Sequence, residues 1–297
     1  MRRSARAEPL RGLGVQLIEG DITDAGAMLQ GCAGADAAVH LAGMYRLGPI
    51  DEREMRRVNV DGTRTFLNAV AGAGVPRAVH VSTTIVLPPA VESTDLGECE
   101  PWSRDRLPTL YQRTKAEAHT LARAAQRRGA PVIIACPANI YGPRDDGPNG
   151  RFLRDLLRRR VPALVREPAW FSYVYVDDVA AGLALVTDHG RIGGCYLFGG
   201  EVESINGFAQ RVARAAGVRP PRLRLPAAAI AASARLLDAF ARATGSRFTI
   251  SHESVRISSR ERWVHDDAAT REELHWWPRG LDRGILDMLD AEAKAKP

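Results

Sequence analysis

Short apolar runs alternate with amphipathic stretches through the first two-thirds of the chain. The apolar runs predict strands at residues 14–19, 35–41, 77–82, 131–136 and 195–198. The amphipathic stretches predict helices at residues 25–30, 51–71, 110–128 and 176–187. Alternating strands and helices are typical of a parallel sheet with helices on its faces. We therefore predict an α/β fold with a doubly wound parallel sheet.

The pattern changes twice further along the chain. Residues 143–149 read PRDDGPN, a run that breaks regular structure. After Gly200 helical periodicity dominates, most clearly at residues 225–244. These changes predict a sheet-containing lobe and a smaller, mostly helical lobe that would bind the substrate. The first would comprise residues 1–143 and 172–200, and the second residues 144–171 and 201–297.

Composition and charge exclude several classes of protein. No run of about 18 apolar residues could span a bilayer, and the basic start lacks the apolar core of a signal peptide. The net charge is +6, but 38 arginines are spread along the chain among 35 acidic residues, so we expect no nucleic-acid partner. We expect a cytoplasmic protein with no membrane partner.

The four cysteines, Cys32, Cys99, Cys136 and Cys195, are far apart and include no C-x-x-C pair or histidine cluster. This spacing predicts neither a metal site nor a disulfide framework. It agrees with a reducing compartment.

One internal lysine stands out against this arginine-rich background. Lys115 is the only lysine before the terminal Lys294 and Lys296. It follows Tyr111 by four residues, so both side chains would share one helix face. A compact ammonium about 5 Å from a phenol, at an effective dielectric constant near 20, favours the phenolate by about 3 kcal/mol, or roughly two pKa units. The pair could therefore exchange protons near neutral pH, although an ordinary helix surface could also carry a Tyr and a Lys.

Hydroxyl side chains precede this pair at the end of the predicted strand 77–82. Ser82, Thr83 and Thr84 would lie at the carboxyl edge of the sheet, where ligands bind in parallel α/β folds. Further segments read HLAG at residues 40–43, NVDGT at 59–63, YQRTK at 111–115, PANIYGP at 137–143 and YVDDVA at 175–180. In order and spacing these segments resemble the extended short-chain dehydrogenases/reductases, also called the NAD-dependent epimerase/dehydratase family. The resemblance covers nearly the whole chain and is strongest to dihydroflavonol reductase-like and sterol dehydrogenase-like members.

The resemblance implies a Rossmann-like fold and assigns roles to individual residues. Tyr111 would be the acid/base, Lys115 would lower its pKa and bind the nicotinamide ribose, and Thr84 would hydrogen-bond the reacting oxygen. The remaining cofactor-binding residues would be Arg3, Asp21, Ile22, Leu41, Ala42, Gly43, Asn59, Ser82, Pro137, Asn139 and Ile140. For single residues simpler explanations stay open: Asp21 could cap a helix, and Gly43 could form a turn.

The family's N-terminal glycine-rich turn has no counterpart in this sequence. No G-x-x-G-x-x-G precedes the first predicted strand. Either the start of the coding sequence lies further upstream, or the chain is a truncated relative that no longer binds a dinucleotide. We favour the first hypothesis because a decayed chain has no reason to keep its single internal lysine at position 115.

The predicted function is NAD(P)-dependent oxidation or reduction of a small molecule that carries an alcohol or ketone. Basic residues near Arg3 favour NADP over NAD, since they suit a 2′-phosphate. A sugar-nucleotide epimerase or dehydratase and a non-catalytic nucleotide-sensing module are the alternatives. The resemblance also implies a homodimer interface from residues 51–71 and 110–128. Tyr45, Trp170, Phe171, Tyr173 and Tyr175 would form an aromatic substrate pocket if they face the site.

Overall fold

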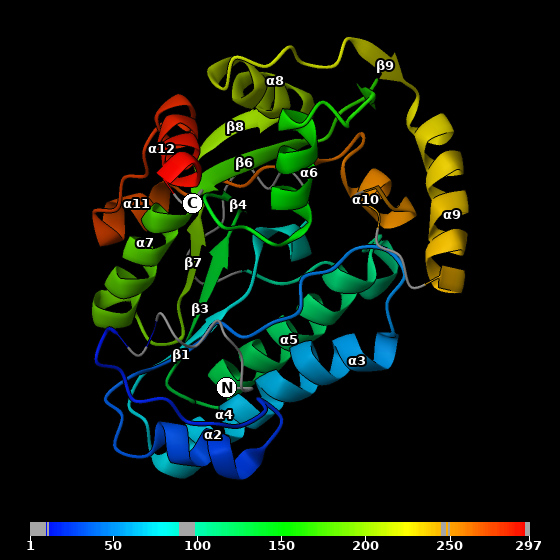
Figure 1. Ribbon diagram of the computed structural model, residues 1–297. Coiled ribbons are helices and arrows are strands. Elements are labelled where there is room, and N and C mark those ends of the chain that lie inside the picture. Colours follow the sequence, from blue (N-terminus) through cyan, green and yellow to red (C-terminus); the bar gives the residue numbers. More distant parts are fainter. Residues whose placement is uncertain (1–9, 11, 89–98, 245–247, 249, 295–297) are drawn as a thin grey trace.

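A parallel four-stranded sheet forms the centre of the computed structural model (Figure 1), which describes residues 10, 12–88, 99–244, 248 and 250–294. Its strands are β1 (Ala38–His40), β2 (Ala78–Val81), β3 (Val132–Pro137) and β7 (Cys195–Phe198), in the order β1-β2-β3-β7. Every neighbouring pair is parallel, with Ala78 opposite Ala38 and Val132. The predicted fold class is therefore confirmed.

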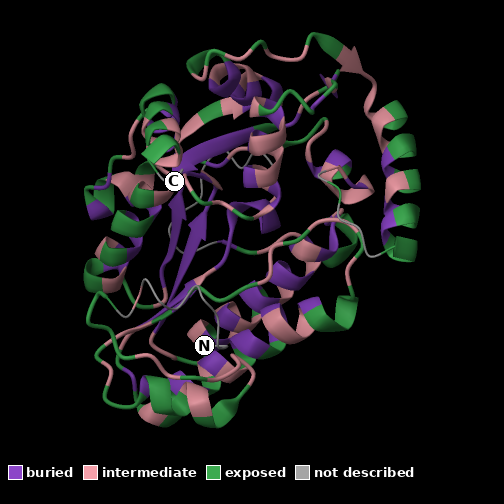
Figure 2. Ribbon diagram, viewed as in Figure 1, coloured by how far each residue is buried: buried purple, intermediate pink, exposed green. Residues whose placement is uncertain are grey.

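Helices cover both faces of this sheet because its central strand is apolar on both sides. Val132, Ile134 and Cys136 of β3 join one buried cluster, whereas Ile133 and Ala135 join another. The first cluster includes side chains of α4 (Gly62–Ala73) and α5 (Leu110–Arg127), and the second those of α7 (Val176–His189) and α11 (Ala268–Leu274). Figure 2 shows the resulting buried sheet between exposed outer helix faces.

The helix that carries Tyr111 and Lys115 matches its predicted range closely. The Thr109 side chain accepts a hydrogen bond from the Gln112 amide and caps the start of α5. The helix ends at Arg127, and Gly129 follows with φ 81°, a left-handed conformation that favours glycine. Both ends are thus fixed by residues visible in the sequence.

Two predicted elements of the first lobe differ from the structure. Residues 14–19 form no strand, so β1 is the edge of the sheet. At this edge Val39 of β1 is 39% exposed, and Leu41, just after the strand, is 66% exposed. An apolar run becomes a strand only where a neighbouring backbone pairs with it. The predicted helix 51–71 is divided into α3 (Glu52–Arg56), a π-helical turn at Arg57–Asp61 and α4. Asn59 lies in this turn, and its side-chain amide forms hydrogen bonds with Met44 and Thr114, which lie outside the turn.

The chain beyond residue 138 contains short strands that the pattern missed. They are β4 (Asn139–Tyr141), β6 (Trp170–Tyr175), β8 (Glu201–Ser204) and β10 (Arg262–Trp263), all arranged around β6, and the pair β5 (Ala163–Val165) and β9 (Leu223–Leu225). The helices are α6 (Pro148–Leu157), α8 (Ile205–Ala215), α9 (Ala227–Thr244), α10 (His252–Ile257) and α12 (Leu281–Lys294), with α2 (Ala25–Cys32) in the first lobe. The strands are two to six residues long, too short for a clear alternation of apolar and polar positions.

Within the described ranges, none of the helices combines the length and the apolar character needed to cross a bilayer.

Candidate active site

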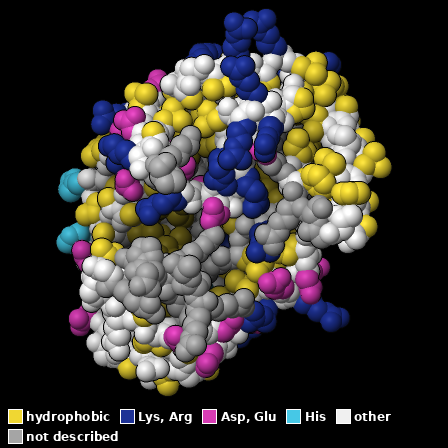
Figure 3. All heavy atoms as spheres, in the orientation of Figure 1, with side chains coloured by type: hydrophobic (Ala, Val, Ile, Leu, Met, Phe, Trp, Pro, Cys, Tyr) yellow, Lys and Arg dark blue, Asp and Glu magenta, His cyan; other side chains and the backbone are white. Residues whose placement is uncertain are grey.

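A cavity of about 460 Å³ lies beyond the carboxyl ends of β2 and β3. Figure 3 shows a hollow on one face of the molecule, with hydrophobic side chains inside and basic side chains near its rim. The cavity brings together residues from four separate stretches of the chain that were predicted to bind the cofactor or to react. They are Leu41, Gly43, Ser82, Tyr111, Lys115, Pro137, Asn139 and Ile140. The carboxyl edge of the sheet is thus the place where the predicted residues meet.

Tyr111 and Lys115 line this cavity from the first two turns of α5. The Tyr111 ring contacts the Tyr45 ring, with 4.5 Å between their centroids. Burial raises the pKa of the Tyr111 phenol, opposite to the predicted direction. The Lys115 Nζ donates a hydrogen bond to the Val81 carbonyl at 2.8 Å, and burial lowers the pKa of this ammonium to about 8.

The three hydroxyl residues after β2 have different surroundings. Ser82 and Thr83 line the cavity, whereas Thr84, the residue predicted to contact substrate, is only 1% exposed and is not part of the wall. Its Oγ1 is buried and has no hydrogen-bond partner among the described residues. Thr83 was not predicted as a site residue, although it stands between two that were.

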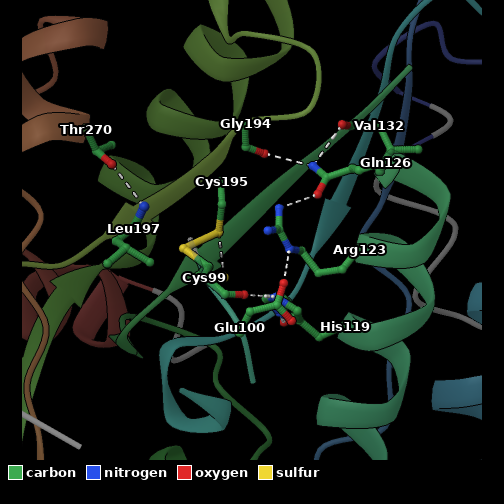
Figure 4. The surroundings of a disulfide bond; sticks show 12 residues. Cys99, Glu100, His119, Arg123, Gln126, Val132, Gly194, Cys195, Leu197 and Thr270 are labelled. Atoms are coloured by element: carbon green, nitrogen blue, oxygen red, sulfur yellow. Dashed lines mark hydrogen bonds and ion pairs between the residues drawn. A yellow bond between two sulfur atoms is a disulfide. The ribbon is translucent and has the colours of Figure 1, made fainter. Parts of the chain in front are cut away.

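Ser82 belongs to a chain of hydrogen bonds that runs away from the cavity, and Figure 4 shows the part of it between His119 and Cys99. The Ser82 hydroxyl is 2.8 Å from Nδ1 of His119, and Nε2 of His119 is 2.7 Å from the Cys99 carbonyl. A carbonyl only accepts, so Nε2 must donate and Nδ1 must accept the Ser82 hydrogen. Burial is the main cause that lowers the His119 pKa to about 4, which agrees with a neutral ring. The serine hydroxyl therefore already donates within the protein.

A disulfide between Cys99 and Cys195 contradicts the prediction made from cysteine spacing. It joins the segment before α5 to β7, with 6.2 Å between the Cα atoms. The two cysteines are 96 residues apart in sequence, and only the folded sheet brings them together. Disulfides persist mainly in oxidising compartments, so the cysteines no longer support the expectation of a reducing one.

The loop after β1 is held in place by Asn59, which is 2% exposed. Its Oδ1 accepts from the Met44 amide at 2.6 Å, and its Nδ2 donates to the Met44 carbonyl and to Oγ1 of Thr114. The amide is thus engaged with the protein on both sides. Asn59 fixes the loop that carries Leu41 and Gly43 but does not itself line the cavity.

Other predicted cofactor residues lie outside the cavity wall. Asp21 accepts from Thr23 and from Arg57 at 2.9 Å, and Ile22 lies against Gly62, where an added Cβ would overlap its side chain. Ala42 is exposed beside the wall, and Arg3 lies outside the described residues.

Of the five aromatic residues proposed for the substrate pocket, two line cavities in this region. Tyr45 and Phe171 do so, whereas the Tyr173 ring stacks on Phe208 in the core. Trp170 lies near the Arg262 guanidinium and Tyr175 near that of Arg279.

Two residues of the second lobe complete the site and were not predicted. Asn149 donates to Oδ1 of Asn139 at 2.5 Å, and both line the cavity. Glu253 of α10 accepts from the Leu110 amide at 2.8 Å and from the Gly48 amide at 3.0 Å. Asn149 ends the PRDDGPN segment, which carried a structural signal, but nothing in the sequence around Glu253 links it to position 110.

Across the described part of the chain, no three His, Cys, Asp or Glu side chains are grouped so that they could hold a metal ion.

Comparison with known proteins agrees with this arrangement. The model of the NAD dependent epimerase/dehydratase family matches residues 1–199. Sterol demethylase protein B of Methylococcus capsulatus is 31% identical over 296 residues, which cover 97% of this chain and 88% of that protein. A dTDP-glucose 4,6-dehydratase of Mycobacterium tuberculosis is 34% identical over 198 residues, which cover 65% of this chain and 59% of that protein.

A solved structure, that of gox2253, superposes with a TM-score of 0.80 at 27% identity and covers 97% of this chain and 88% of that one. The order of the strands, the cavity at the carboxyl edge and these similarities agree. The chain therefore belongs to the NAD-dependent epimerase/dehydratase family of enzymes, the extended short-chain dehydrogenases/reductases.

Proposed function

We propose that this chain is an NAD(P)-dependent oxidoreductase that interconverts an alcohol and a carbonyl compound, with Tyr111 as acid/base. The observation that carries the proposal is the cavity in which Tyr111 and Lys115 of α5 meet Ser82, Pro137 and Asn139 at the carboxyl edge of the sheet. These residues come from separate elements, and the sheet alone brings them together.

The residues of this site fit a nicotinamide dinucleotide. Lys115 and Thr83 line the cavity and offer an ammonium and a hydroxyl to the oxygens of a ribose or of a reacting group. In this proposal Leu41 and Gly43 border the dinucleotide, Pro137 to Ile140 border the nicotinamide, and Lys115 binds the ribose. When bound, the nicotinamide supplies or accepts the hydride.

The reaction needs a proton to be held at the Tyr111 oxygen and released from it. Burial raises the pKa of this phenol, so the tyrosine is protonated and suited to donate to a carbonyl oxygen being reduced. In the oxidative direction an ammonium at Lys115 favours the phenolate. We propose that ligand binding draws the Lys115 ammonium from the Val81 carbonyl toward the ribose and the phenol.

Substitution of Tyr111 tests the proposal directly. Tyr111→Phe is expected to lower kcat by about 100- to 10,000-fold, because the phenylalanine cannot exchange the proton. Binding of NADPH or NADH, measured by fluorescence, should remain within about twofold of the wild type. Tyr196→Phe is the control, since that hydroxyl bonds to Glu273 on the far side of the sheet. If neither dinucleotide binds, or if Tyr111→Phe keeps full turnover, the proposal fails.

The choice between the two dinucleotides is a separate proposal. We propose NADP, on the basicity of the sequence around Arg3. Competition between NADPH and NADH in the same fluorescence titration tests it. Arg3→Glu should reverse the preference, and no change on this substitution would contradict the assignment.

Dehydration or epimerisation of a sugar nucleotide is the second candidate function. The 34% identity to a dTDP-glucose 4,6-dehydratase supports it. Against it, Ile85 and Val86 follow Thr84 where dehydratases of this family typically have an Asp-Glu pair, and both are buried here. Formation of a 4-keto product from dTDP-glucose would favour this candidate, and its absence alongside alcohol oxidation would favour the first.

A further inference from the structure

An uncharged chamber of about 140 Å³ adjoins the catalytic cavity on the side of the second lobe. Tyr45, Ile85, Asn139 and Asn149 line both spaces. The Tyr45 ring, which contacts the Tyr111 ring, therefore stands between the proposed acid/base and the chamber. A substrate whose oxygen lies at Tyr111 would extend in this direction.

The walls of the chamber are apolar side chains from several elements of the second lobe. Phe152 comes from α6, Leu164 from β5, Phe171 from β6, Ile230 from α9 and Val255 from α10. No Asp, Glu, Lys, Arg or His is among its described lining residues. A phosphate or carboxylate that entered here would lose its hydration without a cation to replace it.

Three polar side chains in the wall have partners within the protein. Nδ2 of Asn206 donates to the Val165 carbonyl at 2.7 Å, and Oγ of Ser254 donates to the Ser251 carbonyl at 2.8 Å. Asn149 donates to Asn139. These three side chains already form hydrogen bonds within the protein. A ligand in the chamber would therefore contact mainly carbon atoms.

A larger space beside the chamber has the opposite character. It measures about 1040 Å³, and Leu47 lines both it and the chamber. Its walls carry Arg46, Arg113, Arg151, Arg235 and Arg242, faced by Asp51, Glu52, Glu54, Asp238 and Glu253. Five carboxylates among five guanidinium groups reduce the attraction for an anion. This space is therefore a weaker candidate for a nucleotide diphosphate than its arginines alone would indicate.

We propose that the substrate is an uncharged alcohol or ketone whose carbinol carbon belongs to, or carries, one apolar ring, and that this ring occupies the chamber. The inference rests on the proposed function. The chamber is close in size to an engineered apolar cavity of about 150 Å³ that holds benzene. On oxidation the carbinol carbon gives a hydride to NAD(P)+ and the hydroxyl gives its proton to the Tyr111 phenolate, so that a ketone, NAD(P)H and the protonated tyrosine result.

Binding to the protein without added dinucleotide tests the chamber independently of turnover. Cyclohexanone and tetrahydropyran-4-one have the same ring size and differ by one ring oxygen. Titration calorimetry or ligand-observed NMR should show about tenfold tighter binding of cyclohexanone, because the chamber leaves the ether oxygen without a hydrogen bond. Equal affinities, or no saturable binding of cyclohexanone, would overturn the proposal.

Two substitutions in one helix locate the binding. Ile230→Asp places a carboxylate in the chamber wall and should weaken cyclohexanone binding at least about tenfold. Ala229→Asp adds the same charge at an exposed neighbouring position of α9 and should leave binding unchanged. Equal effects of the two variants would place the ligand elsewhere. If turnover depends on Tyr111 but occurs only with dTDP-sugars, the proposed substrate class is wrong and the catalytic role of Tyr111 stands. If the protein binds cyclohexanone but neither dinucleotide, the proposed oxidoreductase function is wrong and the chamber stands.

Discussion

Lys115 is a single residue at which catalysis and stability oppose each other. The residue is 7% exposed, and burial lowers the pKa of its ammonium from 10.5 to about 8. Between pH 8 and 10.5 the unfolded chain binds the proton that the folded protein has lost, so stability rises with pH in this range. At neutral pH the buried charge therefore costs free energy that a neutral side chain would not.

Lys115→Met should stabilise the fold and abolish the activity. We expect a gain of about 2 kcal/mol in the free energy of unfolding at pH 7, after allowing for the lost bond to the Val81 carbonyl. Turnover should fall at least about 100-fold. Urea denaturation and steady-state kinetics measure the two effects, with the exposed Lys294→Met as control. A variant that loses both stability and activity would show that the ammonium holds the strand end instead.

Buried histidines predict sensitivity to acid. Burial is the first cause that lowers the pKa of His40 to about 3 and those of His119 and His265 to about 4. Below pH 6.5 the unfolded chain binds more protons than the folded one, so stability falls as the pH drops toward 4. Each group shifted to about 4 contributes a loss of about 3 kcal/mol by that pH.

We expect the protein to unfold between pH 6.5 and 4. Circular dichroism measures the midpoint of this transition. His265→Gln can still donate to the Pro88 carbonyl but cannot titrate, so its midpoint should move to lower pH. The exposed His189→Gln should leave the midpoint unchanged. Identical midpoints for wild type and His265→Gln would show that other groups control acid unfolding.

The chemistry of single residues was only partly predictable from the sequence. Lys115 could be identified because it is the one internal lysine in an arginine-rich chain, and Tyr111 because it lies one helical turn before it. The predicted direction of the Tyr111 pKa shift was wrong, because burial of the phenol, which depends on tertiary packing, raises this pKa. The placement of Thr83 in the wall and of Thr84 behind it depends on the turn after β2.

At the scale of elements, Glu253 connects α10 to the start of the catalytic helix. Its two carboxylate oxygens accept from the amides of Leu110 and Gly48, one residue before Tyr111 and three after Tyr45. An acidic side chain at a helix N-terminus is also favoured by the helix dipole. The contact thus fixes both tyrosines of the site from the second lobe.

Glu253→Ala should leave both amides without their acceptor. We expect a loss of about 2–3 kcal/mol in unfolding free energy, and a decrease in kcat together with an increase in KM as the two tyrosines lose their alignment. Glu253→Gln keeps one acceptor oxygen and should show about half of the stability loss. The exposed Glu272→Ala is the control. If Glu253→Ala changes stability but neither kinetic constant, the contact is structural only.

Elements with their own sequence signals were predicted well, and elements that depend on neighbours were not. Thr109 and Gly129 delimit α5, and the apolar run of β7 gave its bounds without error. Residues 14–19 have the same apolar character but form no strand. The π-helical turn at Arg57–Asp61 could not be anticipated, because the partners of Asn59 lie on other elements.

At the scale of the whole molecule, the disulfide ties the segment before α5 to the sheet. Closing a loop of this length stabilises a fold by up to about 5 kcal/mol through the entropy of the unfolded chain. Addition of dithiothreitol should therefore lower the midpoint of urea unfolding. Cys195→Ala should lower it equally and remove the response to dithiothreitol, whereas Cys32→Ala should keep that response. Four free thiols in the non-reduced, denatured protein would contradict the bond.

The isolation of Lys115 within α5 gives this molecule a built-in reporter of unfolding. A protease that cuts only after lysine finds one internal target, the bond after residue 115, besides those at Lys294 and Lys296. That bond lies inside an 18-residue helix packed on the sheet, so it can be cut only when α5 opens. Cleavage gives two large fragments of unequal size that the Cys99–Cys195 disulfide still joins, so they separate on a reducing gel. The rate of this single cut would measure the opening of the catalytic helix, and a ligand that binds beside Tyr111 would slow it without any turnover.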